Sequence, residues 1–451
     1  MNKTIKRLLC LAIALGVAVI PFTAAFAADK AEDKAEDKTM KEEYIACAVN
    51  STCVIDAYGD NNKNAVKIQP EDNGFAGVWL ALPGLNQKNA GDEVHIEARI
   101  RFEAETPYGY SYADVVDNKG NVIDGQFKVN KWQNLVFDAE IYAKEGKKCV
   151  FVGFKTAKNN DIYLSDIAVT DDVYTTENMF GGVKMTIIEP KKNQTEGFML
   201  VTENGKIIMI DGGDQYDKDN VVKLIRQYKN EVDDWHISHY HCDHVFALIR
   251  ILEEEDIFIK NLYYDFNVSN DILEKYGDED NYLVARMKKA VEENRSKIGN
   301  VITPEKGNEF VTDGVKVKIL NNAKFRAMAN MPNDSSIVLK VETPGKKILF
   351  LGDLGTYGDV LLKDEYFYNE IRDCEVVQLG HHGQNGVSDK FYQSLPAMKT
   401  AIYCAPEWLF DCNAGKGIGS GSWQTLRTRE IMRVLKIRKT YSLKYGRVEL
   451  G

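Results

Sequence analysis

This sequence of 451 residues lacks an excess of positive charge and has few cysteines and few long apolar stretches. Lysine and arginine number 57 against 67 aspartate and glutamate, so the formal net charge is −10 at pH 7. This acidic balance argues against a general nucleic-acid binder, which carries a basic footprint. The 8 cysteines are too few and too scattered for a disulfide scaffold. The length is sufficient for two domains, each with its own core.

The one long apolar run lies at the N-terminus. A basic start ending at Arg7 precedes an apolar segment over 8–22, and Ala25-Phe26-Ala27 has the small-x-small pattern of a cleavage site. The run is short for a membrane anchor, which is the alternative interpretation. Residues 1–27 are therefore predicted to be a signal peptide. The protein is then secreted, extracellular or at the cell surface, with no transmembrane segment in its mature form.

Two further segments precede the middle of the chain. Residues 28–43 contain a near repeat of Lys-Ala-Glu-Asp and are predicted to be a charged, solvated spacer. Residues 44–175 contain short alternating stretches, such as Val94–Ile100, separated by turn-forming residues. This pattern predicts an all-β sandwich. The stretch Ile162–Val169 resembles the closing strand of jelly-roll carbohydrate-binding modules.

Aromatic residues in this predicted sandwich are candidates for contact with a polysaccharide. Aromatic rings can stack on sugars, although in most proteins such residues belong to the core or its rim. The candidates are Trp79, Tyr108, Tyr110, Tyr112 and Trp132.

The pattern changes after Gly181-Gly182. From residue 183 onward, predicted strands such as Lys206–Ile210 and Trp235–Ser238 alternate with stretches of helical period. Strands and helices in this order predict two sheets packed between layers of helices.

Six of the seven histidines lie in two clusters within 183–451. The first is His236 followed by His239-Tyr240-His241-Cys242-Asp243-His244, and the second is His381-His382. Imidazole at this density is typical of a metal site. The first cluster lies between a predicted strand and a predicted helix, and such a turn can direct two imidazoles at one metal and a carboxylate with an imidazole at a second. Two metals about 4 Å apart can bind a phosphoryl group.

These motifs resemble the metallo-β-lactamase fold superfamily over residues 183–451. The resemblance rests on Asp211 after a strand, on the first histidine cluster, and on Gly352-Asp353 after the apolar strand Ile348–Leu351. The order of Asn333-Asp334-Ser335-Ser336 and His381-His382 is similar to the hydrolase domain of DNA-uptake competence proteins and to teichoic-acid phosphorylcholine esterase. It implies an α/β fold, an αββα sandwich preceded by the jelly-roll-like domain, and a phosphodiesterase-type hydrolase.

The resemblance also implies roles for individual residues. His239 and His241 are expected to bind one metal, and Asp243 with His244 the other. Asp353 is expected to bridge both. The metal is expected to be Zn²⁺, as one or two ions, with Mn²⁺ as the alternative. Asp243 is the candidate proton acceptor.

The remaining roles carry alternatives. One of His381 and His382 is expected to complete the second site, with His381 favoured, and His382 then contacts the anionic group of the substrate. Asp211 is expected to orient the ligand turn by hydrogen bonds. Many superfamily members have a third histidine for the first metal, but no histidine lies between His244 and His381. Asp334 or Ser335 is expected to contribute there, directly or through water.

The sequence thus predicts a secreted hydrolase of a phosphoester, held near a polysaccharide or cell-wall polymer by the sandwich. One alternative is an extracellular nuclease of the competence type, which the basic stretch over 423–451 favours and the net charge opposes. The other is a surface-binding protein whose hydrolase domain is inactive.

Overall fold

The structure is a computed structural model that describes residues 40–57, 59–170, 174–323, 325 and 330–451. The predicted signal peptide (1–27) and residues 28–39 of the predicted spacer lie outside the described residues. Within these ranges, no helix combines the length and the apolar character needed to cross a membrane.

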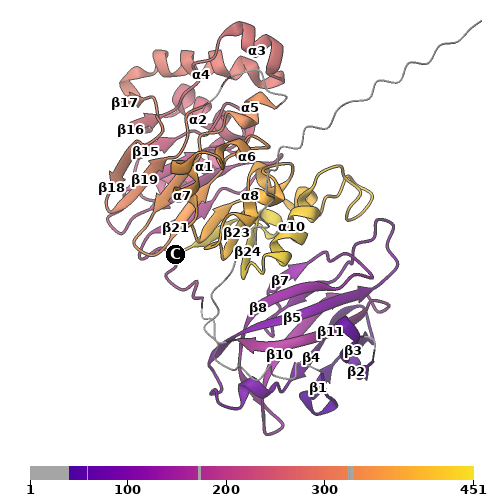
Figure 1. Cartoon of the computed structure of the whole chain (residues 1–451). Helices are drawn as coiled ribbons and strands as arrows, with labels where there is room; N and C mark the ends of the chain where they lie inside the picture. Colours follow the sequence, from indigo (N-terminus) through magenta and orange to yellow (C-terminus); the bar gives the residue numbers. More distant parts are fainter. Residues whose placement is uncertain (1–39, 58, 171–173, 324, 326–329) are drawn as a thin grey trace, which may run out of the picture. The chain divides into compact units, whose positions relative to one another are not determined.

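The strands from β1 to β11 form two antiparallel sheets around one apolar core (Figure 1, indigo to magenta). In β5, Val94, Ile96, Ala98 and Ile100 belong to this core, because alternate side chains of a strand point to the same face. One sheet has the order β1 (Ile45–Val49), β4 (Gly74–Leu80), β10 (Lys147–Thr156), β6 (Asp114–Val116), β7 (Val122–Gly125), and β9 (Tyr142–Lys144) pairs with β10. The other has the order β2 (Ser51–Asp56), β3 (Ala65–Pro70), β11 (Asp161–Thr170), β5 (Glu93–Glu103), β8 (Gln133–Glu140).

The aromatic candidates for sugar contact differ in exposure. Trp79 is buried in a small cluster with Cys149 and Phe151, so its ring is not available for stacking on a ligand. Tyr108 and Tyr112 are exposed. Tyr110 and Trp132 are half-buried. Sugar binding therefore stays a prediction, and it now depends on the three tyrosines and Trp132 rather than on Trp79.

The strands from β12 to β25 form two mixed sheets. The first has the order β17 (Ile298–Ile302), β16 (Phe258–Tyr263), β15 (Glu231–His236), β14 (Ile207–Asp211), β13 (Gly197–Val201), β12 (Lys184–Ile187), β25 (Val448–Leu450). The second has the order β18 (Glu309–Thr312), β19 (Val315–Ile319), β20 (Leu339–Glu342), β21 (Lys347–Phe350), β22 (Val376–Gln378), β23 (Thr400–Tyr403), β24 (Lys439–Ser442).

The two mixed sheets pack face to face between helices. In β14, Ile207 and Met209 belong to the core shared with helices, whereas Ile208 and Ile210 belong to the core shared with β19, β20 and β21. All five β14 residues are buried, and the first four, Ile207 to Ile210, form the continuous apolar run expected of a strand that is covered on both faces. This is the αββα arrangement expected from the sequence.

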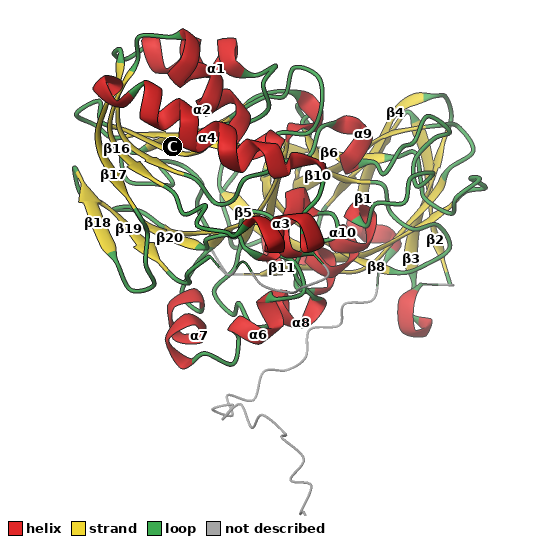
Figure 2. Ribbon diagram, turned by 90° about the horizontal axis from the view of Figure 1, so that it is seen from above, coloured by secondary structure: helices red, strands yellow, loops and turns green. Residues whose placement is uncertain are grey.

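Helices α1, α2 and α4 cover the first mixed sheet, and they lie side by side in Figure 2. The outer face of the second sheet packs against α6 to α10. The helices are α1 (Lys218–Arg226), α2 (Cys242–Glu254), α3 (Asn270–Tyr276), α4 (Tyr282–Glu293), α5 (Met331–Asp334), α6 (Gly358–Leu361), α7 (Glu365–Ile371), α8 (Asp389–Gln393), α9 (Glu407–Phe410) and α10 (Thr425–Val434).

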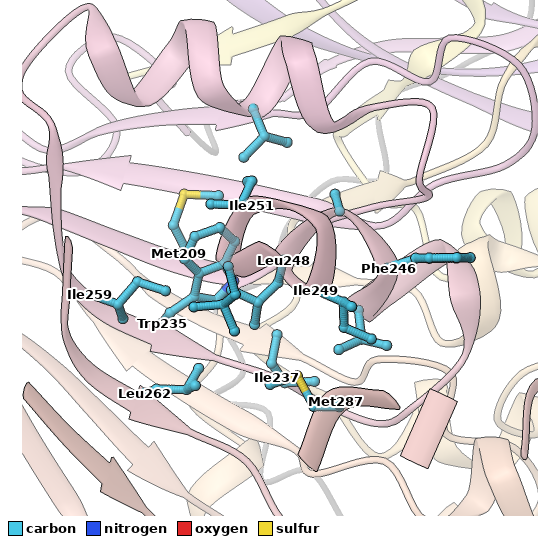
Figure 3. Packing of buried hydrophobic residues seen from close by; sticks show 14 of the residues in the cluster. Met209, Trp235, Ile237, Phe246, Leu248, Ile249, Ile251, Ile259, Leu262 and Met287 are labelled. Carbon is cyan, nitrogen blue, oxygen red and sulfur yellow. The ribbon is translucent and has the colours of Figure 1, made fainter. Parts of the chain in front are cut away.

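Helix α2 is buried on most of its sides. Its residues Val245, Leu248, Ile249 and Leu252 recur at the helical period and are all buried. Figure 3 shows Leu248 and Ile249 packed in this core, close to Trp235. Truncating such a leucine to alanine costs about 2–5 kcal/mol. This packing fixes the first turn of α2, which carries two of the predicted metal ligands.

Candidate metal centre

The predicted ligands follow the carboxyl ends of parallel strands in both mixed sheets. Strands β14 and β15 run parallel and end at Asp211 and His236. Strands β21 and β22 also run parallel and end at Phe350 and Gln378. Loops at the carboxyl ends of parallel strands meet at one edge of a sheet, which is where open α/β proteins bind ligands. The first histidine cluster, Asp353 and the histidine pair therefore converge.

Asp353 stands between two pairs of imidazoles. Its Oδ1 lies 3.2 Å from His244 Nε2 and 3.6 Å from His382 Nε2. Its Oδ2 lies 3.9 Å from His239 Nε2 and 3.6 Å from His381 Nε2. Each carboxylate oxygen thus faces its own pair of histidines. A carboxylate in this position can serve two cations at once.

Two donor groups can be defined around Asp353. The inner donor group is defined by distance as His244, His382, Asp243 and Asp353 Oδ1, since Asp243 Oδ2 lies 3.0 Å from His382 Nε2 and Asp243 Oδ1 lies 3.9 Å from His244 Nε2. Glu196 also has a carboxylate oxygen within 4.8 Å of ligand atoms of His244, His382 and Asp353. The outer donor group is His239, His241 and Asp353 Oδ2.

Glu196 is also close to His382, but on the other side of its ring. Glu196 Oε2 lies 3.9 Å from His382 Nδ1, whereas Asp243 and Asp353 face Nε2. An imidazole presents one nitrogen to a given cation, so Glu196 does not share an ion with His382 Nε2. Burial raises the pKa of Glu196 to about 8, which favours the neutral acid. We therefore leave Glu196 out of the inner donor group; its Oε2 accepts a hydrogen bond from Gln378 Nε2 at 2.9 Å.

The centre fits a divalent metal ion. Among the buried atoms that make no hydrogen bond in the described part of the chain are His239 Nε2, His244 Nε2, His382 Nε2 and both Asp353 carboxylate oxygens. Buried polar atoms without partners are costly and rare in proteins. A bound cation would satisfy all of them. Imidazole and carboxylate donors suit zinc and other divalent transition metals, so the donor set alone does not select one.

The inner histidines are held by their second ring nitrogens. His244 Nδ1 lies 2.8 Å from Asp211 Oδ2, and His382 Nδ1 lies 3.1 Å from the Cys404 carbonyl. Asp211 also accepts hydrogen bonds from the Ser238 amide and hydroxyl, at 2.8 and 2.7 Å. Such bonds fix the ring orientation of metal-binding histidines. They leave each Nε2 directed at Asp353.

Electrostatics keep the inner carboxylates ionised. Burial alone would raise the pKa of Asp353. The nearby His244 and His382 have the larger, opposite effect, so the pKa of Asp353 lies well below its usual value. The same two histidines outweigh the effect of burial on Asp243, whose pKa is also lowered. His239 behaves differently, because burial and neighbouring histidines lower its pKa well below 6.5. A neutral imidazole is the form that binds a metal.

The structure reverses the expected order of the histidine pair. The sequence favoured His381 as ligand of the second site and His382 as substrate contact, but His382 is fully buried in the inner donor group. His381 lies on the outer side, with 17% of its side chain exposed. Both residues have left-handed backbones, with φ of 54° and 56°. This strained pair turns the two rings toward different oxygens of Asp353.

Two residues of the Asn333–Ser336 segment face the centre, but not the two that were expected. Asp334 Oδ1 accepts hydrogen bonds from the Gly355 and Tyr357 amides at 2.9 and 3.1 Å, so it braces the turn after Asp353. The Ser335 hydroxyl donates to a local carbonyl within the segment. Neither donates an atom to the outer donor group. Asn333 and Ser336 face it instead, because Asn333 Nδ2 lies 3.5 Å from His381 Nε2 and Ser336 Oγ lies 3.4 Å from His239 Nδ1.

Three polar residues near the centre were missed by sequence reasoning. Gln378 Oε1 accepts from the Leu351 and Gly352 amides at 2.6 and 2.9 Å and thereby fixes the turn that carries Asp353. Gln194 Nε2 donates to Asp243 Oδ2 at 2.7 Å. Asp278 Oδ2 lies 2.7 Å from His241 Nε2. None of the three lies in a recognisable motif, so the sequence carried no signal for them.

His236 and Cys242 take no part in the centre. His236 is buried and its ring stacks on Tyr263, with a centroid distance of 4.1 Å. Cys242 is absent from both donor groups.

The basic stretch near the C-terminus is largely buried or paired. Arg429, Arg433 and Arg438 are 4–6% exposed, and Lys444 pairs with Asp411 at 2.9 Å. These residues do not form an open basic surface. They therefore give no support to the nuclease alternative.

Comparison with known proteins identifies one family model. The family described as anti-Pycsar protein Apyc1 matches residues 180–387, a range that contains both donor groups. The search of curated proteins found no match.

Several solved structures are similar at low identity. YhfI from Bacillus subtilis, a metallo-β-lactamase fold protein, is 10% identical, covers 59% of this chain and 99% of its own, and has a TM-score of 0.37. Zn²⁺-bound PqqB from Methylobacterium extorquens is 10% identical with the same coverage and a TM-score of 0.34. CmlA from Streptomyces venezuelae, a diiron β-hydroxylase, is 11% identical over 63% of this chain and 55% of its own, with a TM-score of 0.38. At these values the likenesses assign no activity to the chain.

Proposed function

We propose that this protein is a secreted, metal-dependent hydrolase of the metallo-β-lactamase type that cleaves phosphoesters, phosphodiesters in particular. The observation that carries the proposal is Asp353, a buried carboxylate whose two oxygens face separate pairs of imidazoles. Two donor groups that share one carboxylate suit two ions a few ångströms apart. Divalent ions bound in this way polarise phosphoryl oxygens and lower the pKa of water.

Two carboxylates of the centre have different neighbours but share one proposed role. The ionised Asp353 and Asp243 offset the charge of bound cations. Because Asp243 Oδ2 lies 3.0 Å from His382 Nε2 and Asp243 Oδ1 lies 3.9 Å from His244 Nε2, the position of this carboxylate suits it to holding a cation. Its predicted role in proton transfer therefore takes second place in the proposal. Gln194 holds Asp243 Oδ2 in position by a hydrogen bond of 2.7 Å.

The proposal includes location and partners. The N-terminal sequence supports secretion, because a basic start, an apolar segment and Ala25-Phe26-Ala27 occur in the order of a signal peptide. The exposed Tyr108 and Tyr112 support contact between the N-terminal sheets and a polysaccharide or cell-wall polymer.

The test is metal content together with hydrolysis of bis-p-nitrophenyl phosphate, for the unchanged protein and for Asp353→Asn. We expect close to two equivalents of metal and measurable turnover in the unchanged protein. Asp353→Asn should lose turnover by at least about 100-fold, the scale seen when a group that stabilises charge in the transition state is removed. Asp359→Asn is the matched control, since this carboxylate on α6 accepts a hydrogen bond from Ser388 and lies in neither donor group.

Two outcomes would contradict the proposal. One is unchanged turnover in Asp353→Asn. The other is a fully metal-loaded protein that hydrolyses no phosphoester, which would favour the inactive surface-binding alternative.

A further inference from the structure

The two donor groups differ in how many ligands each has for itself. Besides the shared Asp353, the inner donor group has His244, His382 and Asp243. The outer donor group has only His239 and His241. Zinc in hydrolases usually takes three protein ligands and keeps one position open.

His381 is placed to supply the missing ligand. Its Nε2 lies 3.6 Å from Asp353 Oδ2, the same oxygen that faces His239 Nε2. The His381 amide donates to the Gly352 carbonyl at 3.0 Å, so its backbone is tied to the residue before Asp353. The ring therefore lies on the outer side of Asp353, opposite His382.

The side chain of Asn333 lies beside His381 and contains a buried atom without a hydrogen-bond partner in the described ranges. Its Nδ2 lies 3.5 Å from His381 Nε2, which is a weak contact between two nitrogens. Its Oδ1 is buried and has no hydrogen-bond partner in the described ranges. The two ends of an amide can exchange by rotation of the side chain. Rotation would direct the unpaired Oδ1 toward His381 Nε2, where it adds an oxygen donor beside that nitrogen on the outer side of Asp353.

The contacts of His241 determine which of its two ring nitrogens can bind a metal. Its Nε2 lies 2.7 Å from Asp278 Oδ2, so Nδ1 is the nitrogen left for a metal. The loop with Asp278 is held to the ligand turn by a second bond, from the Cys242 amide to Asp280 Oδ2 at 2.8 Å. A carboxylate on the second nitrogen is the usual means of orienting a ligand histidine.

We propose that His381 completes the outer donor group, so that the consecutive histidines His381 and His382 serve two different metal ions. Asp278 is a positioning residue that fixes His241 with Nδ1 toward the outer ion. This inference rests on the proposed function only in requiring bound metal. Since 14% of the His241 side chain and 17% of that of His381 are exposed, while the inner histidines are fully buried, the outer ion binds more weakly and exchanges more readily.

The experiment is a competition titration of the metal-free protein with Zn²⁺ and a chromophoric chelator. Wild type should bind two ions with unequal affinity. His381→Asn should weaken the second ion by at least about 10-fold and leave the first unchanged, since first-sphere losses exceed the 10–100-fold typical of supporting residues. His382→Asn should instead remove the tighter ion. Asparagine is chosen because it tolerates the left-handed backbone at both positions.

Asp278 is tested in the same assay. Asp278→Ala should weaken only the second ion, by about 10-fold. Asp278→Asn retains an acceptor for His241 and should recover part of the loss. Glu279→Gln, an exposed neighbour, should change nothing. Nitrogen chemical shifts of labelled imidazoles add a readout that needs no turnover, because Zn²⁺ should shift Nδ1 rather than Nε2 of His241.

The inference is overturned if His381→Asn binds both ions as wild type does, if it loses the tighter ion, or if wild type binds fewer than two. Circular dichroism checks that both histidine variants keep their secondary structure. If His381→Asn does not, His381→Gln takes its place. Two ions with the predicted pattern but no phosphoester turnover would uphold the inference and reject the proposed activity.

Discussion

The inner and outer donor groups share Asp353 but are built in different ways. Every inner side chain is buried, and His244 and His382 are each held from behind by groups of the β-sheet framework, Asp211 and the Cys404 carbonyl. The outer His241 is held by Asp278, whose side chain is 41% exposed and lies in a loop. We therefore expect a tightly held ion in the inner donor group and a more exchangeable ion in the outer donor group, whose His241 side chain is 14% exposed.

Removal of metal should have the largest effect on the stability of the protein, because both donor groups lose their cation. Metal that binds only the folded protein stabilises it by about 4 kcal/mol when its concentration is 1,000-fold above Kd. The melting temperature should then fall by roughly 10 °C on chelation. Differential scanning calorimetry with and without a chelator measures this. Asp353→Asn should show almost no dependence on metal, and an equally large shift in that variant would contradict the account.

Gln378→Leu should damage both groups together, since Gln378 fixes the turn that carries the shared Asp353. The change leaves the buried Leu351 and Gly352 amides without their acceptor. Each unpaired buried group costs about 1–3 kcal/mol, so we expect a loss of about 3 kcal/mol in the free energy of unfolding. Urea denaturation checks this against Gln393→Leu, at an exposed position of α8. Equal losses in the two variants would show that the turn is not held by Gln378.

His236 allows the effect of burial on stability to be measured apart from metal binding, because this histidine is buried but belongs to neither donor group. Burial lowers its pKa to about 4, and the partial opposition of Asp234 does not reverse this. The unfolded state therefore binds a proton below about pH 6.5 when the folded state does not. His236 alone should therefore contribute a loss of about 3 kcal/mol in the stability of the metal-free protein as pH falls from 6.5 to 4, at about 1.4 kcal/mol per pKa unit.

His236→Phe should remove this pH-dependent loss, because phenylalanine can stack on Tyr263 without titrating. Its stability at pH 7.5 should equal or exceed that of the unchanged protein, since two unpaired buried nitrogens disappear. Denaturant titrations of both metal-free proteins across this pH range give the comparison. A variant with the same pH slope would assign the loss to other groups.

The smallest effect is expected from Asp211→Asn, which should lower the metal affinity of the inner donor group alone. Asp211 contacts His244 at 2.8 Å and has no contact with the outer histidines in the described structure. We expect metal affinity of the inner group to fall by about 10- to 100-fold, with the outer group unchanged. The zinc competition titration checks this, and equal weakening of both ions would contradict the division.

Sequence patterns were sufficient to predict the layers and the ligand turn. The continuous apolar run of β14 and the helical period of Val245, Leu248 and Ile249 follow directly from which faces are buried. The spacing from His239 to His244 likewise determines which residues meet where a strand passes into a helix.

Other features of the centre depend on tertiary structure that no local pattern encodes. The division of His381 and His382 depends on two left-handed backbones in succession, which the sequence does not specify. Gln378 and Asp278 act through contacts with turns remote in sequence, and Asp278 contacts His241 across 37 positions. The strand expected over Trp235–Ser238 ends at His236, because the next residues already form the turn toward the ligands.

The most direct test of two unequal metal positions sharing Asp353 is anomalous diffraction at the zinc edge from crystals grown with Zn²⁺. The account predicts two peaks flanking Asp353. One lies among His244, His382 and Oδ1, and a second of lower occupancy lies beside His239, His381 and Oδ2. A single peak, or one on the Nδ1 side of His382 beside Glu196, would contradict it.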